Sequence, residues 1–242
     1  MAVIETCRSA AGVTHVTLNR PDKANALNDE MVAGLQAALD AGATDGTRLL
    51  VLRAEGRHFC AGFDLSDLDD CSDGDLLLRF VCIETVLQAL YHAPFPTLAL
   101  AQGRAMGAGA DLFAACSRRI ATDKTSFRMP GLAFGILLGT RRLAARIGTD
   151  AARAIQTETR TFDAAEAQTL GFATEVCDPD GWPALAAAAE KAATTLTSQA
   201  TAALFRATVA DTRSADMADL VASAARPGLR QRIQDYRDSL KR

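Results

Sequence analysis

The stretch AQGRAMGAGADLFAAC, residues 101–116, decides the fold of this chain. It follows a short apolar strand pattern and turns into a helical pattern near Ala108. Gly103, Gly107 and Gly109 permit a close approach of two backbones that a β-carbon would prevent. Free N–H groups at a helix start carry partial positive charge and suit an anion or a developing oxyanion. The alternative is that these glycines only serve tight packing of a strand against a helix.

The GxxxGxG spacing in this stretch also occurs in the nucleotide-binding loop of short-chain dehydrogenases. That loop should follow the first strand, whereas residues 103–109 lie in the middle of the chain. The dehydrogenase chemistry also needs a Tyr with a Lys four residues later. Tyr91 is followed at that distance by Phe95. Tyr236 is followed by Leu240. The sequence therefore argues against an NAD(P) enzyme of this kind.

Strand and helix patterns alternate around this stretch, which predicts an α/β architecture. Strand patterns lie at residues 13–21, 49–55, 96–103 and 118–129, and helical patterns at 22–42, 76–93 and 107–117. Asn28 is a plausible N-cap of the first helix and Gly42 a plausible end, while residues 69–75 form an acidic loop. After DPDG (178–181) every pattern is helical. We expect a core of residues 1–180 and a C-terminal helical part of residues 181–242.

Composition narrows the functional classes. Among the 242 residues, 49% are apolar and 23% are charged, which is typical of a globular protein. No apolar run reaches about 18 residues, and no secretory signal is visible. The six cysteines form no CxxC pair, so we expect reduced thiols, a cytoplasmic protein and no metal. The net charge of −3 argues against a nucleic-acid surface.

Four segments together resemble the crotonase family, also called the enoyl-CoA hydratase/isomerase superfamily. They are LNRPDKANALN (18–28), FCAGFDL (59–65), the stretch at 101–116 and FRMPGLAFG (127–135). FDAAEAQTLGFATEV (162–176) looks like the element that closes the family's core. The resemblance implies a ββα spiral core that binds acyl-CoA, with C-terminal helices that form trimers or dimers of trimers.

The resemblance also implies an oxyanion hole made of two backbone N–H groups that polarise a thioester carbonyl. One belongs to Phe63, after the AG of FCAGFDL, and the other to Ala108. By the same resemblance, Lys23, Ala24 and Ala61 should contact the adenine and pantetheine of coenzyme A, which arrives as part of the substrate. The acidic loop at residues 69–75 should lie near the acyl mouth.

The family's hydratases add two carboxylates to this hole. The first position is Asp111, three residues after the second donor, where Asp replaces the usual Glu. The second position, twenty residues later, is Gly131, so one carboxylate is missing. Asp111 could instead be a solvated or helix-capping acid. We expect hydration to be slow or absent.

Other titratable residues are weaker candidates. We expect Glu84 to face the surface of its helix, although it could replace the missing carboxylate. His58 and His92 lie in loop patterns where His is common, and His15 lies in a strand. Asp64 should brace the FCAGFDL turn.

Three functional hypotheses remain. The first is an acyl-CoA hydratase/isomerase-type enzyme that uses Asp111 as its sole acid/base. The second is another thioester reaction, decarboxylation or hydrolysis, in which the oxyanion hole supplies most of the rate. The third is an acyl-CoA-binding protein with little or no turnover.

Overall fold

A six-stranded sheet runs through the computed structural model, which describes residues 2–240. β1 and β2 pair antiparallel, and every later pair in the order β1-β2-β3-β4-β6-β9 is parallel. The strands are β1 (Ile4–Arg8), β2 (Val13–Leu18), β3 (Leu49–Ala54), β4 (Thr97–Ala101), β6 (Arg118–Ala121) and β9 (Glu175–Val176). All five residues of β4 are buried, as the near-continuous apolar run of a strand covered on both faces requires.

Three short strands form a second sheet beside the first. They are β5 (Arg104–Met106), β7 (Ser126–Arg128) and β8 (Thr161–Asp163), in the order β5-β7-β8. The chain leaves β4, forms β5 in the second sheet and enters helix α3 (Ala108–Ala115) directly afterwards. Gly107 makes this turn with a φ of 51°, in the left-handed half of the map that glycine adopts readily.

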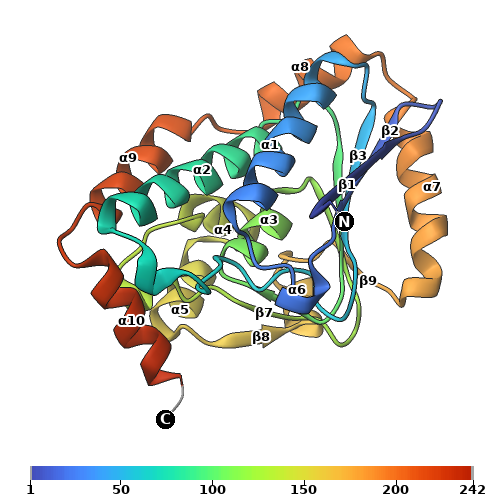
Figure 1. Ribbon diagram of the computed structural model, residues 1–242. Helices are drawn as coiled ribbons and strands as arrows, with labels where there is room; N and C mark the ends of the chain where they lie inside the picture. Colours follow the sequence, from blue (N-terminus) through green and yellow to red (C-terminus); the bar gives the residue numbers. More distant parts are fainter. Residues whose placement is uncertain (1, 241–242) are drawn as a thin grey trace.

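Helices cover both faces of the six-stranded sheet (Figure 1). The other α-helices of the described residues are α1 (Asp29–Thr44), α2 (Asp73–Tyr91), α4 (Thr140–Ile147), α5 (Thr149–Glu158), α6 (Ala164–Thr169), α7 (Trp182–Ala193), α8 (Ser198–Thr208), α9 (Arg213–Ala224) and α10 (Leu229–Ser239). The largest core cluster joins one face of the sheet to α1, α2 and α3. On the other face, Ala189 and Ala193 of α7 pack against Val51 and Leu98.

The C-terminal helices α9 and α10 complete a third apolar cluster over α2. Its buried members are Leu68, Leu76, Phe80, Ile136, Leu220, Ala224, Leu229 and Ile233. One carboxylate attaches α10 to α2: Asp73 accepts backbone N–H bonds from Gly228, Leu229 and Arg230 at 3.0, 3.1 and 2.8 Å. A carboxylate at a helix N-terminus is stabilised by the free N–H groups there.

The strand and helix patterns of the core are confirmed, with changes at their ends. Asn28 caps α1 as predicted, since its side chain accepts the Met31 N–H at 3.0 Å. Gly42 was the wrong end, because α1 continues to Thr44 and Gly42 instead packs beneath Phe95. Part of the predicted acidic loop is helical, since a capping box starts α2 within it. Strand β1 was not predicted.

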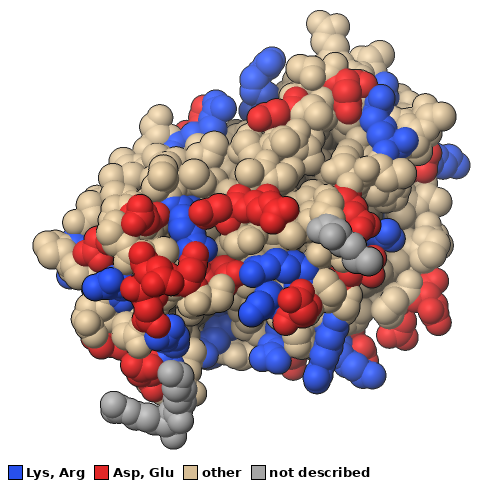
Figure 2. Space-filling model, viewed as in Figure 1, with Lys and Arg blue, Asp and Glu red and all other residues tan. Residues whose placement is uncertain are grey.

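The division of the chain at residue 180 stays a prediction. The C-terminal helices pack against the core on two sides (Figure 1). Within the described part of the chain, no helix has the length and apolar character to cross a membrane. On the face seen in Figure 2, acidic and basic side chains are interspersed. That face carries no broad basic surface of the kind that nucleic-acid binding requires.

Candidate active site

Two glycine-containing loops, residues 59–65 and 101–109, are called the glycine loops below. A cavity of about 480 Å³ lies between these loops, α5 and α10. Its apolar wall includes Phe63, Leu65, Phe80, Met106, Met129, Ile136, Leu138 and Ile233. Phe63, Ala108, Asp111, Gly131 and Ala61 all line this cavity. The fold thus brings five residues singled out from separate sequence segments into one place. A concave, mostly apolar pocket with few polar groups is the usual form of a small-molecule site.

Three backbone hydrogen bonds hold the glycine loops together, the first from the Phe59 N–H to the Gln102 carbonyl at 2.8 Å. The Cys60 N–H donates to the Arg104 carbonyl at 3.2 Å, and the Met106 N–H donates to the Cys60 carbonyl at 2.9 Å. The loops approach so closely that only glycine fits at two positions. A β-carbon on Gly62 would lie 2.4 Å from the Met106 carbonyl oxygen, and one on Gly109 would lie 2.4 Å from that of Cys60.

The amides of Phe63 and Ala108 have no acceptor within residues 2–240. On either side of Phe63, Leu27 donates to the Gly62 carbonyl at 2.7 Å and accepts from the Asp64 N–H at 3.2 Å. Ala108 is the first residue of α3, where an N–H has no partner inside the helix. Two unused N–H groups at one cavity support the predicted oxyanion hole, which stays a prediction.

Neighbouring side chains fix the Phe63 loop. The Phe63 ring stacks on Phe80 with centroids 4.5 Å apart, and the Arg79 guanidinium lies 4.5 Å from the Phe63 centroid. Asp64 is buried, pairs with Arg20 and accepts the Ser66 N–H at 2.9 Å, so it braces the turn as predicted.

Asp111 lies in the first turn of α3 and is only 3% exposed. The alternative of a solvated acid is therefore wrong. Its Oδ1 is buried and accepts no hydrogen bond from the described residues. Burial raises the pKa of Asp111 to about 8; the nearby Arg142 opposes this rise and Glu84 adds to it. Of the described residues, Asp111 is the only Asp or Glu that lines the cavity.

Gly131 lines the same cavity but leaves no room for a side chain. It opens the short 3₁₀ helix η3 (Gly131–Phe134), and its carbonyl accepts the Ile136 N–H at 2.8 Å. A β-carbon on Gly131 would lie 2.9 Å from the Ile136 carbonyl oxygen. The backbone of Ile136 therefore occupies the space that a side chain at position 131 would need.

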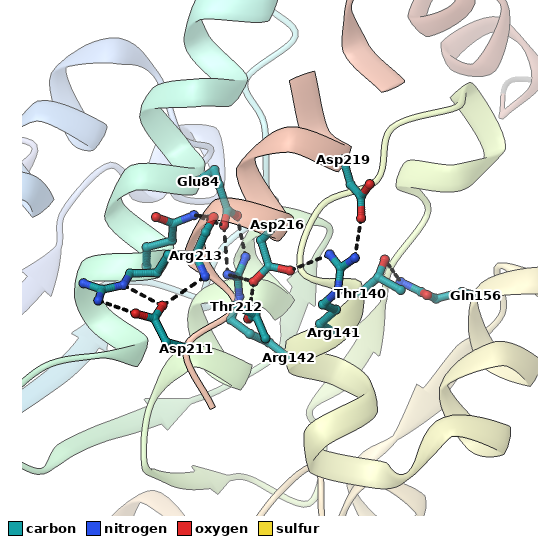
Figure 3. Close-up of polar contacts among 11 residues, drawn as sticks. Glu84, Thr140, Arg141, Arg142, Gln156, Asp211, Thr212, Arg213, Asp216 and Asp219 are labelled. Atoms are coloured by element: carbon teal, nitrogen blue, oxygen red, sulfur yellow. Dashed lines mark hydrogen bonds and ion pairs between the residues drawn. The ribbon is translucent and has the colours of Figure 1, made fainter. Parts of the chain in front are cut away.

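Glu84 does not face solvent, contrary to the prediction. Its side chain is 1% exposed and forms two hydrogen bonds with Arg142, whose side chain is 2% exposed (Figure 3). The spacing of Leu76, Phe80 and Leu87 places residue 84 on the buried face of α2, a signal that the sequence contained. Glu84 does not line the cavity, so it does not replace the missing carboxylate.

The three histidines do not line the cavity. The His58 Nδ1 accepts the Arg104 N–H at 3.2 Å, and burial together with Arg104 and Arg57 lowers the pKa of His58. The pKa values of His15 and His92 are also lowered, chiefly by burial.

The expected coenzyme A contacts are only partly gathered. Ala61 lines the cavity, while Lys23 and Ala24 do not. Ala24 has a left-handed φ of 50°, and its carbonyl accepts the Ala61 N–H at 2.9 Å. The carboxylates of residues 69–75 do not line the cavity either.

Sequence reasoning missed several residues that line the cavity, among them Arg104 and Arg128, and two that reach it from helices distant in sequence. Gln156 of α5 is 6% exposed and donates to the Thr140 hydroxyl at 3.2 Å. It shares the buried face of α5 with Ala152 and Ile155, so a polar residue at helical spacing was the available signal. The second is Tyr236 of α10, whose ring packs against Phe134. Only the tertiary fold places α10 there.

The family of the chain follows from its similarity to known proteins. A family model described as enoyl-CoA hydratase/isomerase matches residues 8–239. The chain belongs to this family. It is 32% identical over 185 residues to the probable enoyl-CoA hydratase echA6 of Mycobacterium leprae, covering 72% of this chain and 73% of that protein.

Two solved structures share this fold. A Bordetella parapertussis protein named as a putative enoyl-CoA hydratase/isomerase superposes with a TM-score of 0.96 at 46% identity, covering 98% of each chain. The enoyl-CoA hydratase of Bacillus halodurans superposes with a TM-score of 0.85 at 24% identity, covering 96% of this chain and 99% of that one. The fold class predicted from the sequence, a crotonase-like core followed by helices, is therefore confirmed.

Proposed function

We propose that this member of the enoyl-CoA hydratase/isomerase family is an enzyme that moves a proton on the acyl group of an acyl-CoA. The Phe63 and Ala108 N–H groups stabilise the thioester enolate, and Asp111 is the only acid/base side chain. The observation that carries the proposal is the lone carboxyl group of the cavity, with its unpartnered oxygen. Syn hydration needs one group to deprotonate water and another to protonate the α-carbon, so one carboxyl group fits it poorly.

A double-bond shift needs only one such group. The Asp111 carboxylate takes a proton from the α-carbon of a 3-enoyl thioester, and the electron pair moves onto the thioester oxygen. The two N–H groups hold that oxyanion; losing one donor of this kind typically costs about 10²–10³ in rate. The same proton is then delivered to the γ-carbon, the carbonyl re-forms and a 2-enoyl thioester results. A pKa of about 8 suits a group that must both take and give a proton near neutral pH.

Decarboxylation is a second candidate, favoured by the resting protonation of Asp111. With a pKa of about 8, this carboxyl group is mostly protonated at pH 7. A 2-carboxyacyl thioester loses CO₂ by breaking its bond to the α-carbon, which leaves the electron pair in the enolate. Protonated Asp111 then donates its proton to the α-carbon. Hydrolysis has no comparable support, because it would need a positioned base for water.

Coenzyme A enters as part of the substrate in this proposal. Ala24 and Ala61 are joined by a backbone hydrogen bond beside the cavity, and Lys23 precedes them on the exposed surface. This arrangement supports a binding path for the adenine and pantetheine along Lys23, Ala24 and Ala61 towards Phe63.

We also propose the trimeric assembly that the sequence predicts. α1 and α2 leave an open groove of about 380 Å³, lined by apolar residues that include Leu27, Val32 and Leu78. Leu78 is 62% exposed in the single chain. Leu204 of α8 is 49% exposed.

Six free thiols are compatible with the reducing, cytoplasmic compartment that we propose.

A panel of thioesters tests the function: 3-hexenoyl-CoA, crotonyl-CoA and malonyl-CoA. We expect turnover of the 3-enoyl or the 2-carboxyacyl substrate and its loss in Asp111→Asn. Asp123→Asn is the matched control, since Asp123 is exposed in a turn outside the cavity. Binding of every thioester without turnover would favour the non-catalytic alternative, and full-rate crotonyl-CoA hydration would contradict the single-carboxyl proposal.

A further inference from the structure

The carboxyl group of Asp111 lies against Gly139, the residue that immediately precedes α4. Gly139 is the N-cap of α4, with a φ of 67°. A β-carbon on Gly139 would lie 1.7 Å from Asp111 Oδ1 and 2.6 Å from its Cγ. The position of the carboxyl group therefore depends on where α4 begins. This contact involves no hydrogen bond, so neighbouring structure must hold α4 in place.

Arg142 ties the first turn of α4 to two other helices (Figure 3). Its Nη1 donates to Glu84 of α2 at 2.9 Å, and it also pairs with Asp216 of α9 at 3.4 Å. The side chain of Asp216 on α9 is 9% exposed and accepts the Thr212 hydroxyl at 2.7 Å. Helices α2, α4 and α9 thus meet at one buried cation.

The two residues before Arg142 add further ties. Arg141 pairs with Asp216 at 3.0 Å and with Asp219 of α9. The Thr140 hydroxyl accepts from Gln156 Nε2, and Gln156 lines the cavity. Three consecutive side chains therefore fix the turn that begins at Gly139 (Figure 3).

The Glu84–Arg142 pair is not arranged for stability alone. A buried ion pair contributes to stability only when its remaining polar atoms are satisfied, and an apolar replacement is often equally stable. The Arg142 Nε is buried and has no partner within residues 2–240. Both charges act on Asp111, since Arg142 lowers its pKa and Glu84 raises it.

We propose that Glu84, Arg142 and Asp216 form a positioning network that fixes the start of α4 and thereby holds the Asp111 carboxyl group against Gly139. Neither Glu84 nor Arg142 lines the cavity. They act through Asp111 and do not touch the reacting atoms. The consequence of this network for catalysis rests on the proposed function. Its effect on the position and titration of Asp111 does not.

The other charged groups on the elements packed against α3 are engaged elsewhere. Arg79 of α2 pairs with Asp67 at 2.9 Å and also with Asp29. Arg104 of β5 bonds to His58, and Arg146 of α4 donates to the Ala114 carbonyl at the far end of α3. Arg142 and Glu84 are therefore the charges whose removal should move the titration of Asp111.

The direct test is the titration of Asp111 by carboxyl ¹³C NMR, with its resonance assigned from Asp111→Asn. Glu84→Gln removes the negative charge that raises the Asp111 pKa, so its midpoint should fall by about one pH unit. Asp219→Asn removes an exposed partner of Arg141 and is the matched control, with an unchanged midpoint. A midpoint in Glu84→Gln equal to that of the wild type would overturn the inference.

A double variant covers the case in which Glu84→Gln does not fold. Glu84→Met with Arg142→Met replaces the buried pair by apolar side chains of similar length, which proteins often tolerate. Both charges are then lost, and the surroundings of Asp111 become less polar. The midpoint of the Asp111 titration should therefore rise rather than fall. A fall, or no change, in this folded variant would contradict the network.

Turnover separates the inference from the proposed function. If both hold, the pH profile of kcat moves with the NMR midpoint of Glu84→Gln while KM changes little. If the midpoint moves but the profile does not, the network stands and the role of Asp111 in the reaction fails.

Discussion

The unpartnered Oδ1 of Asp111 lies against Gly139, at the place where any other residue would carry its β-carbon. The acid/base candidate and the start of α4 are therefore in direct contact. A change at either one displaces the other.

Gly139→Ala should lower turnover by about 10²-fold, because a displacement of a catalytic group by about 1 Å can have that effect. Gly228→Ala is the matched control: Gly228 is the N-cap of α10 with a φ of 78°, and no atom of residues 2–240 lies within 4 Å of the place that its β-carbon would take. Both variants carry the backbone cost of a left-handed alanine, about 1–2 kcal/mol. Steady-state kinetics and thermal unfolding of both variants check this prediction. Equal turnover of the two variants would show that Asp111 takes no part in the reaction.

Asp111→Asn should abolish proton transfer, with a loss of about 10²–10⁴-fold. It should also change how stability depends on pH. The folded-state pKa of about 8 lies above the ordinary value of 3.8, so the folded protein binds the proton more tightly than the unfolded chain. Wild-type stability should therefore fall as pH rises from 4 to 8, by at most about 1.4 kcal/mol per unit, and the Asn variant should lack this fall. Urea unfolding at pH 5 and pH 9 measures the difference; parallel pH dependences would contradict the raised pKa.

Gly131→Glu should not restore hydration. A Glu at this position would supply the missing carboxylate, but its β-carbon would lie 2.9 Å from the Ile136 carbonyl oxygen. We expect a less stable protein that remains inactive on crotonyl-CoA. Gly131→Ala carries the same clash without the carboxylate and should be equally destabilised. Efficient hydration by the Glu variant would show that the turn opens more easily than its hydrogen bond to Ile136 implies.

Ala108→Pro should reduce turnover of any thioester substrate by about 10²-fold or more, because it removes one of the two N–H donors. Proline is well tolerated at the first position of a helix, so the fold should persist. Thr149→Pro makes the same change at the first position of α5, where the residue is exposed, and should leave turnover intact. Circular dichroism and kinetics of the pair decide whether the hole includes Ala108.

Sedimentation equilibrium at micromolar concentration should give the mass of a trimer or hexamer. Leu78→Lys places a charge beside the groove between α1 and α2 and should shift the distribution towards smaller species. Asp123→Asn should leave the mass unchanged. A wild-type monomer would reject the assembly proposal.

The local patterns around the glycine loops carried most of the prediction. Asn28 and the strand alternation depend on neighbours close in sequence. Phe63, Ala108 and Asp111 were predicted from the resemblance to the crotonase family, and the fold gathers these three residues at one cavity. Gly42 failed because burial beneath Phe95 gives it a packing role that sequence cannot distinguish from a helix end.

Contacts between distant segments were beyond such patterns. Glu84 meets Arg142 only because the fold brings these two side chains from α2 and α4 together, whereas a lone Glu in a helix usually faces solvent. The contribution of α10 to the cavity depends on Asp73, which the sequence placed in a loop. Long-range partners of charged residues therefore account for the largest differences.

The attachment of α10 through Asp73 separates two properties of the cavity. Ile233 and Tyr236 form part of its wall, while the N–H donors and Asp111 belong to the glycine loops and α3. Substitutions on α10 can therefore widen or narrow the space for the acyl chain without touching the groups that carry out the chemistry. If the proposed function holds, chain-length preference and reaction type depend on different parts of the polypeptide, so a substitution can change the first without changing the second.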